Sequence, residues 1–267
     1  MRALLFTLAV FSIFAISSPV RAQDSIWEEM ATNFKVTVKA RDAKFIGTSM
    51  GGVHISIKNK LTGDIIADGN IMGGTGPTDK IMQAPMPRDA VIVDDTTASL
   101  QFSLALMEPT LVTITATGPL GQPQNMVSVS EDRVLIPGKD YTAGNGLMLE
   151  MPGMVVDVLT PVAGNNIPLN ADEPLTILAN VRKLCGCEIT ENGMWPASRY
   201  QVEVFIYKDA AFISSVPMAL VDKSQYATKL KMPQAGTFRI VVTAFDPQTK
   251  DSGMDVTTVT LSAPKAE

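Results

Sequence analysis

Histidine and cysteine are scarce in this sequence, and their scarcity limits the chemistry that the chain can perform. Its 267 residues include one histidine, His54, and two cysteines. A catalytic triad needs a histidine base in a cleft, and His54 lies mid-strand between Val53 and Ile55, where a flat sheet face is expected. Imidazole-based zinc or copper sites generally take two or more histidines. We therefore expect a non-enzymatic protein with no resident cofactor.

Positive charge is also in short supply. Lysine and arginine number 22 against 27 acidic residues, which gives a formal net charge of −5. The chain has no basic run and no interleaving of basic and aromatic residues. Because nucleic acids are bound through a cationic surface that neutralises phosphates, we exclude them as partners.

Long apolar runs are missing except at the start of the chain. Met1-Arg2 precedes fourteen largely apolar residues, Ala3 to Ile16, and small residues follow at Val20-Arg21-Ala22. This order is typical of a secretory signal, and the run is shorter than the roughly 20 residues that a membrane-spanning helix needs. The sequence predicts a signal peptide over residues 1–22, cleavage near Ala22, and a periplasmic or secreted product without a transmembrane segment.

Helical periodicity is missing too. Between Lys35 and Ser262 no window places apolar residues at i, i+3, i+4 and i+7, whereas short alternating runs bounded by turn residues recur about every ten residues. The pattern predicts an all-β chain. Its length and the Pro152-Gly153 break favour two tandem β-sandwich domains, over residues 23–153 and 154–267.

The expected strands follow from the alternation of apolar and polar residues. In the first domain they span residues 34–40, 52–58, 64–71, 90–94, 99–106, 110–117, 124–134 and 147–151. In the second they span residues 155–159, 175–182, 200–207, 212–220, 226–232, 237–245 and 254–261. Seven strands at this spacing are typical of an immunoglobulin-like or fibronectin type III-like sandwich.

One segment of the second domain carries a family resemblance. Residues Pro233 to Asp246, with Gly236 and Phe238, resemble the glycine turn, aromatic residue and alternating strand that many bacterial immunoglobulin-like domains place next to last. The resemblance covers about a hundred residues and implies architecture alone, since this fold hosts unrelated functions. Phe238 stands where those domains often have tyrosine, which puts a hydroxyl-mediated corner bond in doubt. The first domain is similar in strand spacing to transthyretin-like or carboxypeptidase-regulatory sandwiches.

The two cysteines form a Cys185-Gly186-Cys187 motif in the connection over residues 183–199. An oxidising compartment drives such a pair toward a disulfide. Three interpretations stay open: a local structural disulfide, a sulfur site for Cu(I), and a redox-active pair that exchanges disulfides or bonds to another chain.

Methionine recurs every third residue at Met148, Met151 and Met154. Thioethers favour Cu(I), so these residues are candidate copper ligands, although packing at a domain junction is the interpretation that we favour. Asp246, Asp251 and Asp255 could likewise gather around calcium, but a solvated acidic face is favoured.

These features favour an exported binding or scaffold protein whose loops contact an envelope or extracellular protein partner. Recognition on a sandwich is usually carried by its loops, and the longest ones span residues 69–88 and 183–199. We expect the contacts to come from Met194, Trp195, Pro196 and Tyr200. A periplasmic Cu(I)-handling protein and a thiol–disulfide redox protein are the alternative functions.

Overall fold

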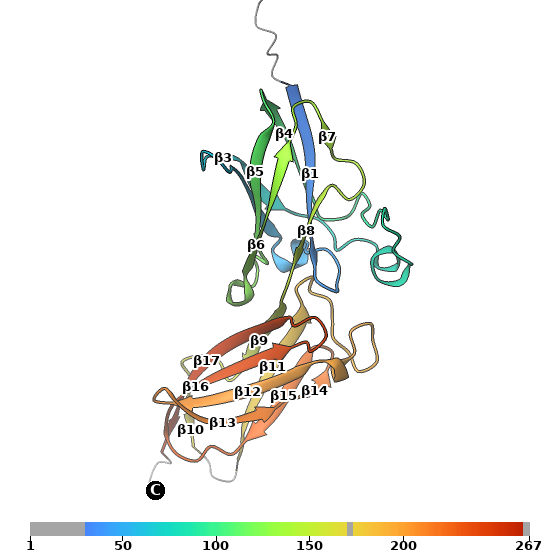
Figure 1. The fold of residues 1–267 in the computed structure, drawn as a ribbon. Helices are drawn as coiled ribbons and strands as arrows, with labels where there is room; N and C mark the ends of the chain where they lie inside the picture. The colour runs from blue at the N-terminus through green and yellow to red at the C-terminus, as the bar shows by residue number, and fades with distance from the viewer. Residues whose placement is uncertain (1–29, 170–172, 264–267) are drawn as a thin grey trace, which may run out of the picture.

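The chain folds into two β-sandwich domains stacked end to end (Figure 1). The structure, a computed structural model, describes residues 30–169 and 173–263. Within these residues it contains seventeen β-strands and only single-turn helices. The predicted all-β class is therefore confirmed. The predicted signal peptide, residues 1–22, lies outside the described residues.

The N-terminal domain consists of two four-stranded sheets. One sheet has the order β4-β1-β7 with β8 also paired to β1, and the other has the order β3-β2-β5-β6. In β2 the apolar residues Val53, Ile55 and Ile57 are buried while His54 is only partly covered, as a one-sided strand requires. The strands are β1 (Met30–Ala40), β2 (Val53–Asn59), β3 (Ile65–Ile71), β4 (Leu100–Leu106), β5 (Thr110–Gly118), β6 (Val127–Leu135), β7 (Asp140–Tyr141) and β8 (Leu147–Met151).

Two predictions for this domain need correction. Residues 90–94 are not a strand, because their apolar side chains find no neighbouring strand; Ile92 instead packs with Phe45 and Ile81 in a small separate cluster. The irregular segment over residues 69–88 is also more ordered than expected. It contains a single π-helical turn, η2 (Asp79–Gln83), which buries Ile81.

The C-terminal domain has a four-stranded sheet in the order β14-β15-β11-β9 and a five-stranded sheet in the order β10-β17-β16-β12-β13. With β9 as the first strand of the sandwich, the first order is the D-E-B-A order of an immunoglobulin fold, and the second contains its G-F-C order with β10 and β13 as additional edge strands. The domain is therefore immunoglobulin- or fibronectin III-like, as predicted. The strands are β9 (Met154–Thr160), β10 (Asn166–Pro168), β11 (Leu175–Lys183), β12 (Gln201–Lys208), β13 (Ala211–Pro217), β14 (Ala219–Asp222), β15 (Gln225–Leu230), β16 (Gly236–Phe245) and β17 (Ser252–Ser262).

The single strand predicted over residues 212–220 is in fact two strands in different sheets. β13 pairs with β12, whereas β14 pairs with β15. The change of sheet occurs at Pro217-Met218. Proline has no N–H to donate to a ladder, and the Met218 N–H donates to the carbonyl of Val202 at 2.8 Å.

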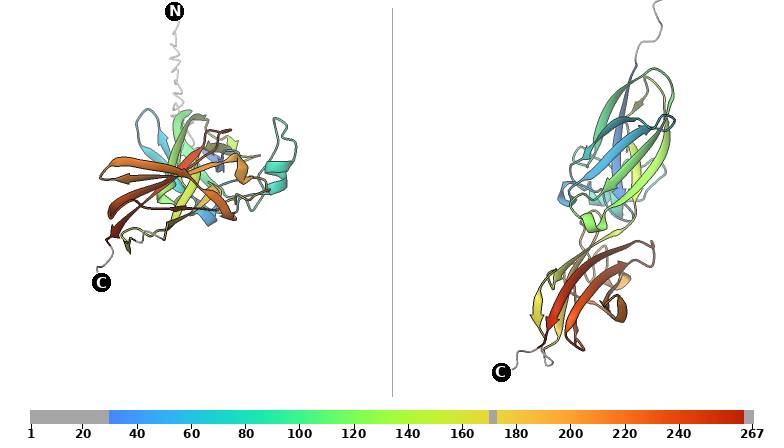
Figure 2. Two further views of the ribbon diagram at one scale, coloured as in Figure 1. Left: turned by 90° about the horizontal axis from the view of Figure 1, so that it is seen from below. Right: turned by 90° about the vertical axis from the view of Figure 1, so that its left-hand side faces the viewer.

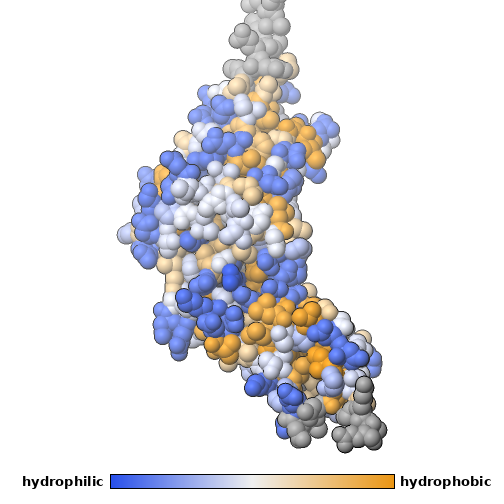
Figure 3. Space-filling view, turned by 180° about the vertical axis from the view of Figure 1, so that it is seen from behind, coloured by the Kyte–Doolittle hydropathy of each residue, from blue (hydrophilic) through white to orange (hydrophobic). Residues whose placement is uncertain are grey.

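The two domains share one hydrophobic core cluster. Buried side chains on facing strands of each sandwich join through residues at the domain boundary, including Met50, Met151, Met154 and Leu184. The side view shows the two sandwiches meeting at this narrow junction (Figure 2). From behind, the surface is a mosaic with apolar patches on both domains (Figure 3). The apolar cluster at the junction positions the polar groups described next.

Candidate functional site

The domain junction is where most of the residues singled out from the sequence meet. The covalent link is only Pro152-Gly153, between the end of β8 and the start of β9. Gly153 has φ +126°, a conformation that favours glycine. Contacts on both sides of this short link hold the two domains.

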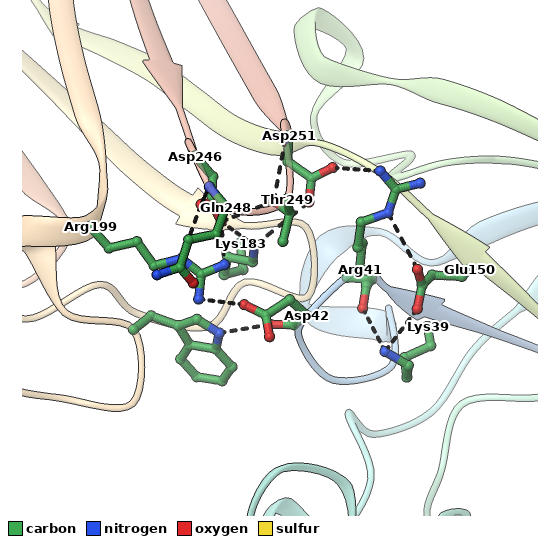
Figure 4. Close-up of polar contacts among 12 residues, drawn as sticks. Lys39, Arg41, Asp42, Glu150, Lys183, Arg199, Asp246, Gln248, Thr249 and Asp251 are labelled. Atoms are coloured by element: carbon green, nitrogen blue, oxygen red, sulfur yellow. Dashed lines mark hydrogen bonds and ion pairs between the residues drawn. The ribbon is translucent and has the colours of Figure 1, made fainter. Parts of the chain in front are cut away.

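The first set of contacts comes from the turn that follows β1. The Asp42 carbonyl accepts a hydrogen bond from the Trp195 indole Nε1 at 2.9 Å, and the Asp42 carboxylate lies 2.7 Å from Arg199 Nη1. Beside it, Arg41 Nη1 lies 3.4 Å from Asp251 Oδ1 (Figure 4). Arg41 also pairs with Glu150 of its own domain. This turn therefore bonds to two separate segments of the C-terminal domain, the connection before β12 and the turn between β16 and β17.

The second set comes from the single-turn helix η3 (Pro123–Asn125). The buried Asn125 side chain donates to the Val156 carbonyl at 2.7 Å and accepts from the Met254 N–H at 3.2 Å. Gln124 Nε2 also donates to the Val156 carbonyl, at 3.1 Å. These bonds tie the N-terminal domain to β9 and β17, away from the Arg41-Asp42 turn.

A buried cluster of charges lies on the C-terminal side of the junction. The side chains of Lys183, Asp246 and Asp251 are fully buried, and Lys183 Nζ lies 3.8 Å from a carboxylate oxygen of each aspartate. Arg199 binds Asp246 with two hydrogen bonds, at 3.0 and 2.5 Å. A buried ionic group is stable only when an opposite charge lies beside it. Removing one member of this cluster would therefore leave another buried without its partner, at a large cost in stability.

Burial shifts the pKa values of two residues of the cluster, and hydrogen bonds decide that of the third. Burial lowers the pKa of Lys183 and raises the pKa of Asp251. Burial alone would also raise the pKa of Asp246, but hydrogen bonds from Arg199, the Gln248 backbone and Thr249 outweigh it and hold that pKa below its ordinary value. Asp246 is therefore the carboxylate of the cluster whose ionised form is favoured.

The sequence expectations for Asp246 and Asp251 are wrong. We expected a solvated acidic face, with calcium as the alternative, whereas both carboxylates are buried toward Lys183. Asp255 accepts a hydrogen bond from the Val158 N–H at 2.7 Å. Among residues 30–169 and 173–263, no three His, Cys, Asp or Glu side chains gather as a metal site.

Cys185 and Cys187 form a disulfide with each other. Cys185 is buried, and Gly186 has φ +78° with its Cα so close to Met50 that a Cβ would lie 2.7 Å from the Met50 sulfur. The motif therefore closes a tight loop against the N-terminal domain. Copper(I) binding and disulfide exchange by this pair stay predictions.

The structure places the predicted partner-contact residues at the junction. Trp195 and Tyr200 are each only 7% exposed, so they offer little surface to a partner, and we correct that expectation. Burial also raises the pKa of Tyr200, whose ring centroid lies 5.9 Å from Lys183 Nζ and 5.6 Å from the Arg199 guanidinium carbon. Met194 remains exposed and Pro196 partly exposed. Trp195 of this loop thus joins the two domains, through its hydrogen bond to Asp42.

The three candidate methionine ligands are not brought together. Met151 and Met154 are buried in the main core cluster. Met148 instead packs against the small cluster around Phe45 and Ile92. Packing near the junction, the interpretation that we favoured, describes Met151 and Met154.

Sequence reasoning missed the charged residues of the junction, although one signal for them was present. In β11 the inward positions are Ile177, Ala179, Val181 and Lys183, so the period of two already places a lysine in the core. A lysine in that register requires carboxylate partners. Nothing in the local pattern indicates that Arg199 and Asp42 would supply further charges from different domains.

No family model and no curated protein matches the chain. Among solved structures, the chain is similar to the fibronectin(III)-like modules of CbhA from Clostridium thermocellum (13% identity, TM-score 0.30, 80% of each chain covered). It is also similar to the FN1–FN3 domains of chicken CNTN1 (12% identity, TM-score 0.27), with 90% of this chain and 65% of that chain covered. A third similarity is to the four N-terminal Ig domains of Dscam1 isoform 6.44 (8% identity, TM-score 0.23), with 88% of this chain and 51% of that chain covered. No helix within the described residues is long and apolar enough to cross a membrane.

Proposed function

We propose that this chain is an exported, non-enzymatic binding or scaffold protein whose two sandwich domains act as one rigid body. The observation that carries the proposal is the two-sided junction, where the Arg41-Asp42 turn and Asn125 bond to the C-terminal domain on either side of the Pro152-Gly153 link. Flexible tandem domains do not need partly buried ion pairs and an indole hydrogen bond between them. A fixed orientation allows surfaces on both domains to face one partner together.

Export through an N-terminal signal is part of the same proposal. A disulfide between Cys185 and Cys187 suits an oxidising compartment, which supports it. The intact mass of the protein isolated from the cell envelope or the medium should correspond to a chain that begins after Ala22. A product that retains residues 1–22 would contradict export by this route.

Rigidity can be tested by small-angle X-ray scattering of the full-length mature protein. We expect the wild-type curve to fit one domain orientation. Trp195→Phe combined with Asn125→Ala removes one interdomain hydrogen-bonding group from each side of the link, and should broaden the distribution of orientations. Lys60→Met, which breaks an exposed ion pair with Asp132 inside one domain, is the matched control and should leave the curve unchanged.

If the wild-type curve already requires many orientations, the rigid-body proposal is wrong. If the double variant keeps a single orientation, the named contacts are not what holds the junction. Circular dichroism and thermal melting of each variant separate loss of the junction from loss of the fold.

A further inference from the structure

The outer face of the five-stranded sheet in the C-terminal domain is unusually apolar. Along β12, Val204 and Ile206 point into the core, so Phe205 and Tyr207 point outward. A sheet of a sandwich usually presents polar side chains on its solvent face. β12 is therefore apolar on both faces, which packing of the sandwich alone does not require.

Strand register extends this apolar character across the sheet. β17, β16, β12 and β13 lie side by side in the lower domain (Figure 1). Phe205 is opposite Val241 on β16, and Val241 is opposite Val256 on β17. Val241 lies outside the core cluster yet is only 7% exposed, whereas Val256 is 40% exposed. These three residues form one apolar row.

The next row is aromatic and includes a cation. Tyr207 is opposite Phe212 on β13 and Arg239 on β16. The Tyr207 and Phe212 ring centroids are 5.8 Å apart, and Phe212 is 57% exposed. The Arg239 guanidinium carbon lies 4.3 Å from the centroid of the Tyr207 ring. Among residues 30–169 and 173–263, the Arg239 side chain has no partner for an ion pair or a hydrogen bond.

We infer that these two rows, Phe205, Val241, Val256, Phe212, Tyr207 and Arg239, form a docking surface for a protein partner that presents apolar side chains around an Asp or Glu. Aromatic and arginine side chains are enriched in the cores of protein interfaces and among the residues that dominate binding energy. A guanidinium held against an aromatic ring offers its N–H donors to a planar carboxylate in a bidentate arrangement. The inference rests on the proposed binding function and names its class of partner.

The rim of the surface fits the same occupant. Ser215 is opposite Phe205 on β13, and Thr258 is opposite Arg239 on β17, so both rows end in hydroxyl groups. Interfaces between proteins commonly have this arrangement of an apolar centre and a polar rim. Charge complementarity is what favours an acidic partner, since the one charge within the rows is the unpaired Arg239.

The test is selection of peptides from a random library displayed on phage, against the immobilised full-length mature protein. Enriched peptides should carry Asp or Glu flanked by aromatic or aliphatic residues. Synthetic copies should bind Phe212→Ser and Arg239→Gln at least about tenfold more weakly than wild type, a loss of about 1.4 kcal/mol, because aromatic and arginine side chains are among the residues that dominate binding energy. Leu61→Ser, which changes an even more exposed apolar residue of the other domain, is the control and should keep wild-type affinity.

Peptides that lack an acidic residue, equal affinity for all variants, or no enrichment would overturn the inference. So would a concentration-dependent dimer in sedimentation that Phe212→Ser abolishes, because the occupant would then be a second copy. Retardation in polysaccharide gels that depends on Phe212 and not on Arg239 would assign the face to a glycan. Unchanged melting temperatures of both variants show that weaker binding is not unfolding. The scattering experiment does not involve this face, so either proposal can fail alone.

Discussion

The domain junction and the outer face of the C-terminal sheet reverse the usual distribution of side chains in opposite ways. The junction buries Lys183, Asp246 and Asp251, whereas the sheet exposes Phe212 beside Tyr207. Buried charges are costly unless each has partners, and such groups can specify one arrangement among several. Exposed apolar clusters do not stabilise a monomer and mark contact surfaces. The buried charges thus help to set how the two domains are arranged, whereas the exposed apolar side chains are available to bind a partner.

The largest expected effect is on stability, at the junction. Asp246→Ala should lower the free energy of unfolding by about 3–5 kcal/mol, because it leaves Lys183 and Arg199 buried without their shared carboxylate. Chemical denaturation measures the loss. Asp132→Ala, in an exposed ion pair with Lys60, is the control and should lower the free energy of unfolding far less, because solvent screens an exposed pair. Equal losses in the two variants would remove the distinction between the buried cluster and an ordinary surface pair.

A smaller loss is expected from the Cys185–Cys187 disulfide. It closes a loop of three residues, for which the chain-entropy relation gives about 1.5 kcal/mol. Replacing both cysteines by serine should lower the free energy of unfolding by this amount, and reducing the wild type should give a similar value. A variant as stable as the oxidised wild type would show that the tight loop against Met50 holds its shape without the covalent bond.

The smallest effect is expected on the sheet face. Phe212→Ser should change the free energy of unfolding by no more than about 0.5 kcal/mol, because the side chain is mostly exposed and outside the core. Thermal and chemical denaturation measure it beside Asp246→Ala. A loss as large as that of the junction variant would mean that the aromatic row stabilises the domain. The contrast between a stabilising junction and a free sheet face would then be wrong.

Local periodicity predicts much of this fold because each strand has one buried face. The alternation over β12, β16 and β17 places those strands within a few residues of their observed ends. It fails over residues 212–220, where Pro217 interrupts a pattern that crosses from one sheet to the other, and over residues 90–94, where no partner strand exists. Pairing between distant segments is not encoded in a local period.

The junction was only half predictable, for the same reason. Trp195 and the cysteine pair stood out as residue types, but their burial depends on Asp42 and Met50 of the other domain. The sequence alone therefore suggested surface contacts where the structure has internal ones. The sheet face, by contrast, could have been found, because Phe205 and Tyr207 alternate with Val204 and Ile206 on the same strand.

The parallel pairing of β1 with β8 has a mechanical consequence. The described chain enters through β1 at one end of the molecule and leaves after β17 at the other (Figure 1). Tension between the ends pulls on the start of β1 and on the end of β8, in opposite directions along two strands held in register from Val36–Leu147 to Ala40–Met151. The ladder is loaded in shear, so its hydrogen bonds must break together. β10 and β17 repeat a short parallel ladder in the second domain.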